Sequence, residues 1–257
     1  MKTSDGMVVA AFVAFVALAQ PITADAAEIK VLSANGMREV MEDLGPKFER
    51  ATGHRLAIAF ATLGVIVQRV QGGETADVLA IPRQGIDRLV QDGKAIRDTV
   101  TVLARAGIGV IVRKGAPKPD ISTPEALKRT LLAAKSITYL DPAAGGTSGV
   151  HFAKVLDRLG ISAELKPKTL LHPNARAAGA MVANGEAEVG INLIQELIPL
   201  PGIDLVGPLP GDLQNTITYA AAIMAGAVDA AASKTLIDFL RTPEAAAVIK
   251  AKGLEPS

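Results

Sequence analysis

The run Asp77-Val78-Leu79-Ala80-Ile81 holds four apolar residues in a row after a single aspartate. A short strand without polar alternation is typical of a parallel sheet whose two faces are both covered by helices. Helical patterns flank this run at residues 65–71 and 85–92, and each of them ends at glycine. The stretch therefore predicts an α/β fold built on a parallel sheet.

The alternation of strand and helix continues on both sides of this stretch. Before it we expect strands at 28–33 and 55–61 around a helix at 37–52. After it, a β-like run at 103–112 is suited to crossing from one lobe to the other. The pattern then restarts with strands at 136–140 and 189–193 and helices at 150–159 and 175–184, and residues 170–171 are a candidate short strand. A strand at 216–223 returns, followed by helices at 230–240 and 243–251. The fold class predicted is α/β, with two doubly wound lobes joined by a hinge.

The division that follows from this order has three parts. Residues 1–26 form a signal peptide, residues 27–103 and 217–257 form lobe 1, and residues 104–216 form lobe 2. Closure is expected as a hinge motion in the crossing segments 102–108 and 216–220.

The first residues have the layout of a secretory signal peptide. A basic Lys2 precedes an apolar stretch from Met7 to Ala19, and Ala24-Asp25-Ala26 fits a cleavage site. The apolar stretch is shorter than the ~20 residues that a membrane span needs. We therefore expect cleavage near Ala26 and a mature protein that lies in the periplasm, outside the membrane.

Composition excludes several kinds of partner. The chain has 27 basic and 26 acidic residues, which argues against nucleic acid as a partner. Aromatic residues make up only 3% and Trp is absent, which disfavours a sugar ligand. There is no Cys, and the three His show no metal-ligand spacing, so we expect no cofactor and no metal.

Three loops lie where a strand gives way to a helix, and such helix starts favour anions. The candidate ligand-binding residues in these loops are Ser33, Asn35, Thr62, Gly146, Thr147 and Ser148. Simple helix capping is the alternative role for the hydroxyl and amide side chains. Arg83 and Arg176 are candidates for carboxylate recognition, and Asn192 is a further candidate in the late strand.

Several stretches together resemble the molybdate-type periplasmic substrate-binding proteins of ABC transporters. They are residues 29–35, 48–53, 76–80, 86–93, 141–142, 184–191 and 238–245. The resemblance implies the type 2 periplasmic-binding-protein fold, a monomer that closes on a small anionic ligand, and an ABC permease as partner. It also implies that Ser33, Thr62 and the loop after Asp141-Pro142 hold the anion.

The chain departs from this family at two places. The family commonly has a Tyr shortly after the late strand, whereas residues 190–195 here contain none. The loop Gly146-Thr147-Ser148-Gly149 is also richer in hydroxyls. Both departures favour an organic di- or tricarboxylate over molybdate.

A second function class stays open at this point. Aconitate isomerase is an exported enzyme similar to the same family, and such an isomerase needs a base next to the substrate carboxylates. His151 or Glu196 would be that base, and loop N–H groups would stabilise the developing charge.

Overall fold

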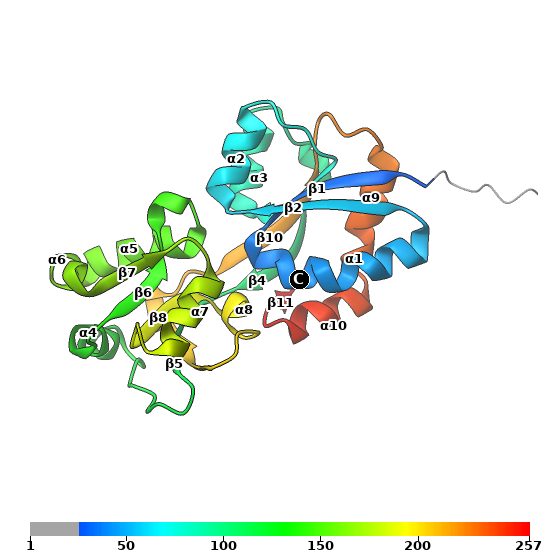
Figure 1. The fold of residues 1–257 in the computed structure, drawn as a ribbon. Coiled ribbons are helices and arrows are strands. Elements are labelled where there is room, and N and C mark those ends of the chain that lie inside the picture. Colours follow the sequence, from blue (N-terminus) through cyan, green and yellow to red (C-terminus); the bar gives the residue numbers. More distant parts are fainter. Residues whose placement is uncertain (1–25) are drawn as a thin grey trace, which may run out of the picture.

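The computed structural model describes residues 26–257, and Figure 1 shows them as two lobes. The predicted signal peptide falls outside the described residues, apart from Ala26. Each lobe is built around one sheet, with helices packed on both of its faces. The two-lobed α/β prediction is confirmed.

The first sheet has six strands in the order β11-β4-β10-β3-β1-β2. Their bounds are β1 Glu28–Ala34, β2 Arg55–Ala61, β3 Val78–Pro82, β4 Thr101–Ala106, β10 Ile217–Ile223 and β11 Glu255–Pro256. β1 pairs in parallel with β2 and β3, whereas β10 runs antiparallel to β3 and β4. The sheet is therefore mixed, because the strand that returns from the other lobe enters it in the opposite direction.

The second sheet repeats this design with five strands in the order β7-β6-β8-β5-β9. Their bounds are β5 Ile108–Arg113, β6 Ile137–Leu140, β7 Thr169–His172, β8 Val189–Leu193 and β9 Ile203–Pro208. β6 is parallel to β7 and β8, and β5 is antiparallel to β8 and β9. Here too the antiparallel strand is the one that has just crossed between the lobes.

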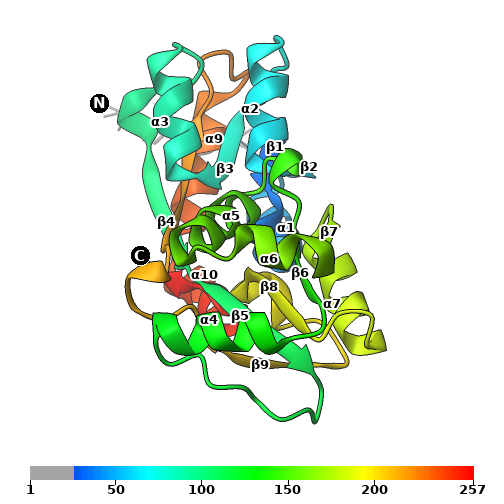
Figure 2. The same ribbon diagram turned by 90° about the vertical axis from the view of Figure 1, so that its left-hand side faces the viewer.

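Helices cover each sheet on both sides, as Figures 1 and 2 show. In the first lobe, α2 and α3 lie on one face and α1, α9 and α10 on the other. In the second lobe, α4, α5 and α6 lie on one face and α7 and α8 on the other. Their bounds are α1 Arg38–Thr52, α2 Leu63–Gln71, α3 Arg83–Gln91, α4 Pro124–Ala133, α5 Thr147–Leu159, α6 Ser162–Leu165, α7 Ala175–Asn184, α8 Ile194–Leu197, α9 Ala230–Phe239 and α10 Pro243–Ala251.

Two crossing segments join the lobes. The first passes from β4 to β5 through Gly107, so the predicted boundary after residue 103 falls inside β4, which runs to Ala106. The second lies between β9 and β10. Its Gln214 side chain makes two hydrogen bonds to the backbone of Ile108 in the first segment: Gln214 Oε1 accepts from Ile108 N at 2.8 Å, and Gln214 Nε2 donates to Ile108 O at 2.9 Å.

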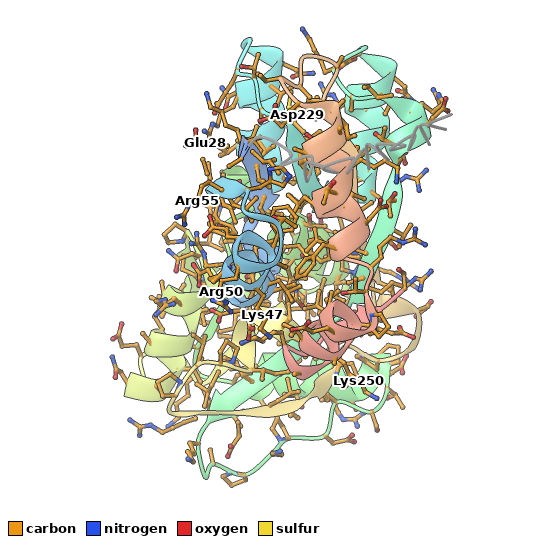
Figure 3. The ribbon with its side chains drawn as sticks, turned by 90° about the vertical axis from the view of Figure 1, so that its right-hand side faces the viewer. Glu28, Lys47, Arg50, Arg55, Asp229 and Lys250 are labelled. Atoms are coloured by element: carbon orange, nitrogen blue, oxygen red, sulfur yellow. The ribbon has the colours of Figure 1, made fainter. Side chains whose placement is uncertain are left out.

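A buried carboxylate links distant segments of the first lobe, and an ion pair joins two of its helices. Asp77 is only 3% exposed, and its two oxygens accept from Lys30 N at 2.8 Å and Val228 N at 2.7 Å. These bonds satisfy a charge that would otherwise be costly to bury. Lys47 of α1, labelled in Figure 3, has its Nζ 3.6 Å from Glu244 Oε1 of α10.

None of the helices within residues 26–257 is long and apolar enough to span a bilayer.

Gly149 of α5 packs directly against the backbone at the end of β6. A Cβ at Gly149 would lie 2.1 Å from Leu140 O, and backbone cannot move away cheaply. We expect Gly149→Ala to lower the free energy of unfolding by about 1–3 kcal/mol in urea titrations. Gly226→Ala is the matched control, because nothing lies within 4 Å of its Cβ. Equal midpoints for the two variants would contradict this packing.

His172, at the end of β7, predicts a pH dependence of stability. It is 3% exposed, and neither ring nitrogen has a hydrogen-bond partner among the described residues. Burial lowers its pKa from 6.5 to about 4. The Asn174 backbone and the Asp141 charge raise the pKa, but by less than burial lowers it. The folded protein thus stays neutral at His172 while the unfolded chain takes up a proton.

Stability should therefore fall as the pH drops from about 6.5 toward 4, by up to about 3 kcal/mol from this residue. His172→Leu should flatten this part of the profile when urea unfolding is measured at several pH values. An unchanged difference between pH 7 and pH 4.5 in that variant would rule out His172 as the source.

Candidate functional site

A cavity of about 520 Å³ lies between the two lobes, at the carboxyl ends of all six parallel strands. In the first lobe, β1, β2 and β3 end there; in the second lobe, β6, β7 and β8 do so. The lining residues at or next to these ends are Ala34, Ala61, Pro82, Leu140, Pro173 and Leu193. This is where ligands bind in α/β sheets, and here two such edges face each other.

Four long helices begin at the same cavity: α1, α2, α5 and α7. The residues before α2 and α5 are Thr62 and Gly146, and neither provides a side-chain cap. The first N–H groups of these helices therefore have no capping side chain, and they favour a bound anion. α7 differs, because Asn174 Oδ1 accepts from Ala177 N at 3.0 Å.

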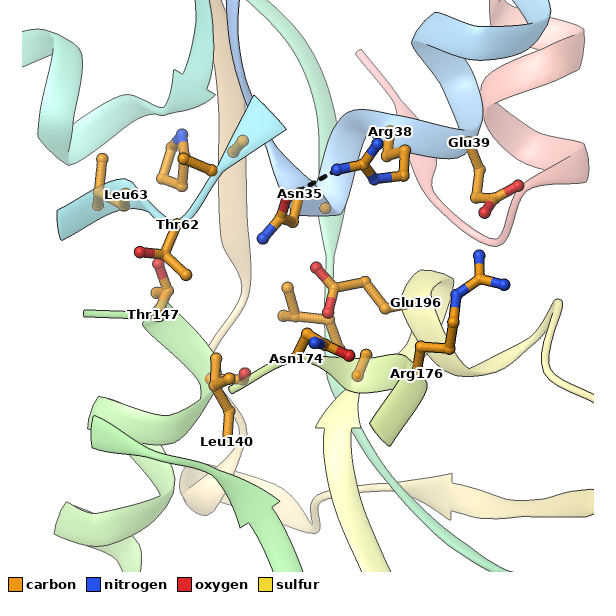
Figure 4. Close-up of a pocket in the computed structure, with 18 of the residues that line it drawn as sticks. Asn35, Arg38, Glu39, Thr62, Leu63, Leu140, Thr147, Asn174, Arg176 and Glu196 are labelled. Atoms are coloured by element: carbon orange, nitrogen blue, oxygen red, sulfur yellow. Dashed lines mark hydrogen bonds between the residues drawn. The ribbon is translucent and has the colours of Figure 1, made fainter. Parts of the chain in front are cut away.

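Two guanidinium groups line the cavity from opposite lobes, as Figure 4 shows. Arg38 begins α1 and is held in place: its Nη2 donates to Asn35 Oδ1 at 3.3 Å, and it pairs with Glu42 at 3.3 Å. Its guanidinium carbon also lies 4.1 Å from the centre of the Phe60 ring. Arg176, the second residue of α7, is exposed at the rim. Arginine forks suit bidentate contacts with carboxylates.

One carboxyl group differs from the others around the cavity. Glu196 of α8 faces the cavity, and in Figure 4 its carboxyl points from the second lobe toward Asn35 and Arg38. Burial raises the pKa of Glu196 from 4.5 to about 7, and the nearby Arg38 charge lowers it only in part. Glu196 can therefore hold or release a proton near neutral pH.

Tyr219 lines the same cavity from β10 and is 1% exposed. Its hydroxyl accepts from Gln195 Nε2 at 3.2 Å, which leaves the hydroxyl hydrogen to donate elsewhere. Burial, and next the charge of Glu196, raise the pKa of Tyr219 well above its ordinary value. Tyr219 is therefore a neutral hydrogen-bond donor at any physiological pH.

The lobes touch at the mouth of the cavity. Thr62 Oγ1 donates to Ala144 O at 2.6 Å, and Gly64 N donates to Gly145 O at 3.1 Å. A Cβ on Gly64 would lie 2.9 Å from Gly145 Cα, so this approach needs glycine on both sides. These contacts describe a closed arrangement of the lobes.

Most of the residues expected to bind ligand come together at this cavity. They are Asn35, Thr62, Gly146, Thr147, Ser148 and Arg176. Glu196, one of the two possible bases, lies there as well.

Four other expected residues lie outside the cavity, for different physical reasons. Ser33 and Asn192 are fully buried within their strands. Asn192 Oδ1 accepts from Ser148 Oγ at 2.6 Å, so Asn192 positions the glycine-rich loop. Arg83 is exposed and pairs with Asp87 at 2.7 Å. His151 contacts Leu213 O at 2.8 Å and lines a separate groove.

Sequence reasoning missed Arg38 and Tyr219. Arg38 could have been found by taking every polar residue in the first turn after a strand, since it follows the Asn35-Gly36 turn. Tyr219 had no such signal, because it reaches the cavity only through the antiparallel pairing that places it opposite Pro82. Within residues 26–257, no cluster of three or more His, Asp or Glu side chains could hold a metal ion.

Comparison with known proteins agrees with this architecture. The model of a family described as bacterial extracellular solute-binding protein matches residues 29–255. An aconitate isomerase from a Pseudomonas species is 36% identical over 93% of this chain and 90% of its own length. The Escherichia coli molybdate-binding protein ModA is 27% identical, with 92% of each chain covered.

A solved structure shows the same fold. The substrate-binding domain of a putative molybdenum ABC transporter from Clostridium difficile superposes with a TM-score of 0.72 at 17% identity, covering 90% of this chain and 100% of that one. The family match extends over nearly all of the described residues, and the paired mixed sheets with a cleft between them fit it. The chain belongs to the bacterial extracellular solute-binding proteins.

Proposed function

We propose that the cleft captures a small organic polycarboxylate. The observation that carries this proposal is the placement of Arg38 and Arg176 on opposite lobes of one cavity. Two carboxylates of one ligand can each meet a guanidinium only when the lobes are together, so binding would favour closure. The cavity of about 520 Å³ falls in the range of roughly 300–1,000 Å³ that is typical of small-molecule sites.

The remaining lining groups support an anion of this kind. The Thr147 hydroxyl and the uncapped starts of α2 and α5 add donors around the two arginines, whereas the hydroxyl hydrogens of Thr62 and Ser148 already go to Ala144 O and Asn192 Oδ1. The proposed role is delivery from the periplasm to an ABC permease as a monomer, after cleavage of the signal peptide near Ala26. The relatives named as molybdate-binding proteins support transport of an anion, and the arginine pair favours an organic one.

A second candidate function is isomerisation of the captured anion. Two observations favour it: the relative at 36% identity is named aconitate isomerase, and Glu196 titrates near neutrality inside the cavity. Interconversion of unsaturated tricarboxylates needs a group that takes a proton from a carbon next to a carboxylate and returns one. Glu196 is placed for this role, whereas His151 faces the other groove.

Ligand binding tests the first proposal. Calorimetric titration with citrate, trans-aconitate and cis-aconitate should show saturable binding, and molybdate, sulfate and phosphate should bind more weakly or not at all. Loss of a charge-assisted contact costs about 1.5–3 kcal/mol. Arg176→Ala should therefore weaken polycarboxylate binding by about 10- to 150-fold.

Arg83→Ala is the matched control, because Arg83 is also an exposed arginine in the first turn of a helix but lies outside the cavity. It should bind like the wild type. Equal loss in both variants, or preference for molybdate over every polycarboxylate, would contradict the proposed ligand class.

The second candidate has its own assay. Incubation with trans-aconitate, followed by chromatography, should show conversion to the cis isomer. Glu196→Gln should slow conversion by at least about 100-fold with the ligand still bound, since removal of a general base typically costs 10²–10⁴-fold. His151→Ala should convert at the wild-type rate. Binding of trans-aconitate without any conversion would leave transport as the function.

A further inference from the structure

The charged side chains around the cavity do not favour an anion when all are ionised. Two guanidinium groups, Arg38 and Arg176, line it together with three carboxyl groups, Glu39, Glu42 and Glu196. Full ionisation gives the lining a net charge of −1. A ligand with two or three carboxylates would then enter a site that already carries excess negative charge. Placing one proton on one carboxyl removes that excess.

For two of the three carboxyls, neighbouring positive charge already balances the negative charge. Glu42 pairs with Arg38 at 3.3 Å, and its side chain is 53% exposed to solvent. Glu39 lies in the first turn of α1, where the helix dipole favours negative charge, and in Figure 4 its carboxyl points toward the Arg176 guanidinium. Both carboxyls therefore have positive charge beside them.

Glu196 has no such compensation. Among the described residues it makes no ion pair and no side-chain hydrogen bond, and its carboxyl faces the cavity between the lobes. Its charged and titratable neighbours are Arg38 from α1 and Tyr219 from β10. Glu39 and Glu42 of α1 and Arg176 of α7 line the same cavity. Burial already favours its neutral form, and an anionic ligand close by would favour that form further. Glu196 is the carboxyl that most readily accepts the proton.

We propose that Glu196 binds the ligand as a neutral carboxylic acid that donates a hydrogen bond to a ligand carboxylate, so that capture of each anion brings one proton into the cleft. This inference rests on the proposed capture of a polycarboxylate. The step balances simply: water or buffer gives a proton to the Glu196 carboxylate, one O–H···O⁻ hydrogen bond forms, and no bond of the ligand breaks. Such charge-assisted bonds are among the stronger ones, and an ionised Glu196 would instead repel the ligand.

Glu196 would then also select among ligands. A neutral acid at this place needs a ligand group that accepts a hydrogen bond and carries negative charge, and the two guanidinium groups need the same. The set of donors therefore fits an anion with several separate acceptor groups. An oxyanion with a single compact charge could not reach all of these donors at once.

Calorimetry in buffers with different ionisation enthalpies tests this directly. At pH 8, with citrate or trans-aconitate fully ionised, about 0.9 proton should be taken up per ligand bound, since a carboxyl with a pKa near 7 is mostly ionised in the free protein. Between pH 7.5 and 9, the Kd should rise by up to tenfold per pH unit.

Glu196→Gln supplies an N–H donor of similar size that does not titrate. It should bind within about tenfold of the wild type at pH 7, take up no proton and lose the pH dependence above pH 7.5. Glu164→Gln, an exposed change on α6, should keep the wild-type pH profile.

Three outcomes would overturn the inference. Proton uptake near zero in the wild type, or a Kd that does not change between pH 7.5 and 9, would show that Glu196 is not protonated on capture. A pH dependence that Glu196→Gln retains would assign the proton to another group. Absence of binding by any polycarboxylate at any pH would instead overturn the proposed function on which the inference rests.

Discussion

Gln214 joins the two segments on which the whole arrangement depends. Its side-chain amide bonds both backbone groups of Ile108, so the two crossings between the lobes are held together at one place. Each crossing enters its new sheet antiparallel to the strands beside it. The parallel strands of both sheets consequently end toward each other, and the helices that follow them begin at one shared cavity. Pairing at the hinge therefore positions the groups that meet a ligand.

The chemistry of the cleft has a general part and a specific part. The Thr147 hydroxyl and the helix starts would suit almost any small anion. Three charged or titratable groups restrict which anions fit. Two positive groups, Arg38 and Arg176, and one proton carrier, Glu196, lie at separate points of the lining. A receptor and an isomerase would share this way of binding. They would differ in the protonation state of Glu196, since a receptor would keep this carboxyl neutral, whereas an isomerase would need it ionised to take a proton from a carbon of the ligand.

The sequence predicted most of the fold because apolar periodicity and glycine stops mark buried strands and capped helices. Helix α7 and strand β8 have the predicted bounds. β9 was missed because its residues are half-buried and carry no alternating pattern. The predicted loops do reach the cavity, since strand order alone places them there. Which side chain of a loop faces the ligand depends on packing, and this is why Ser33 turned out to be buried and Arg38 was overlooked.

The sharpest test is a crystal structure of the protein with trans-aconitate bound. We expect one molecule between the lobes, with separate carboxylates on Arg38 and Arg176 and a third carboxylate within hydrogen-bond distance of Glu196. A ligand held only by the loop hydroxyls, with both guanidinium groups turned away from it, would exclude recognition by these charged groups. So would a ligand seated in the groove beside His151.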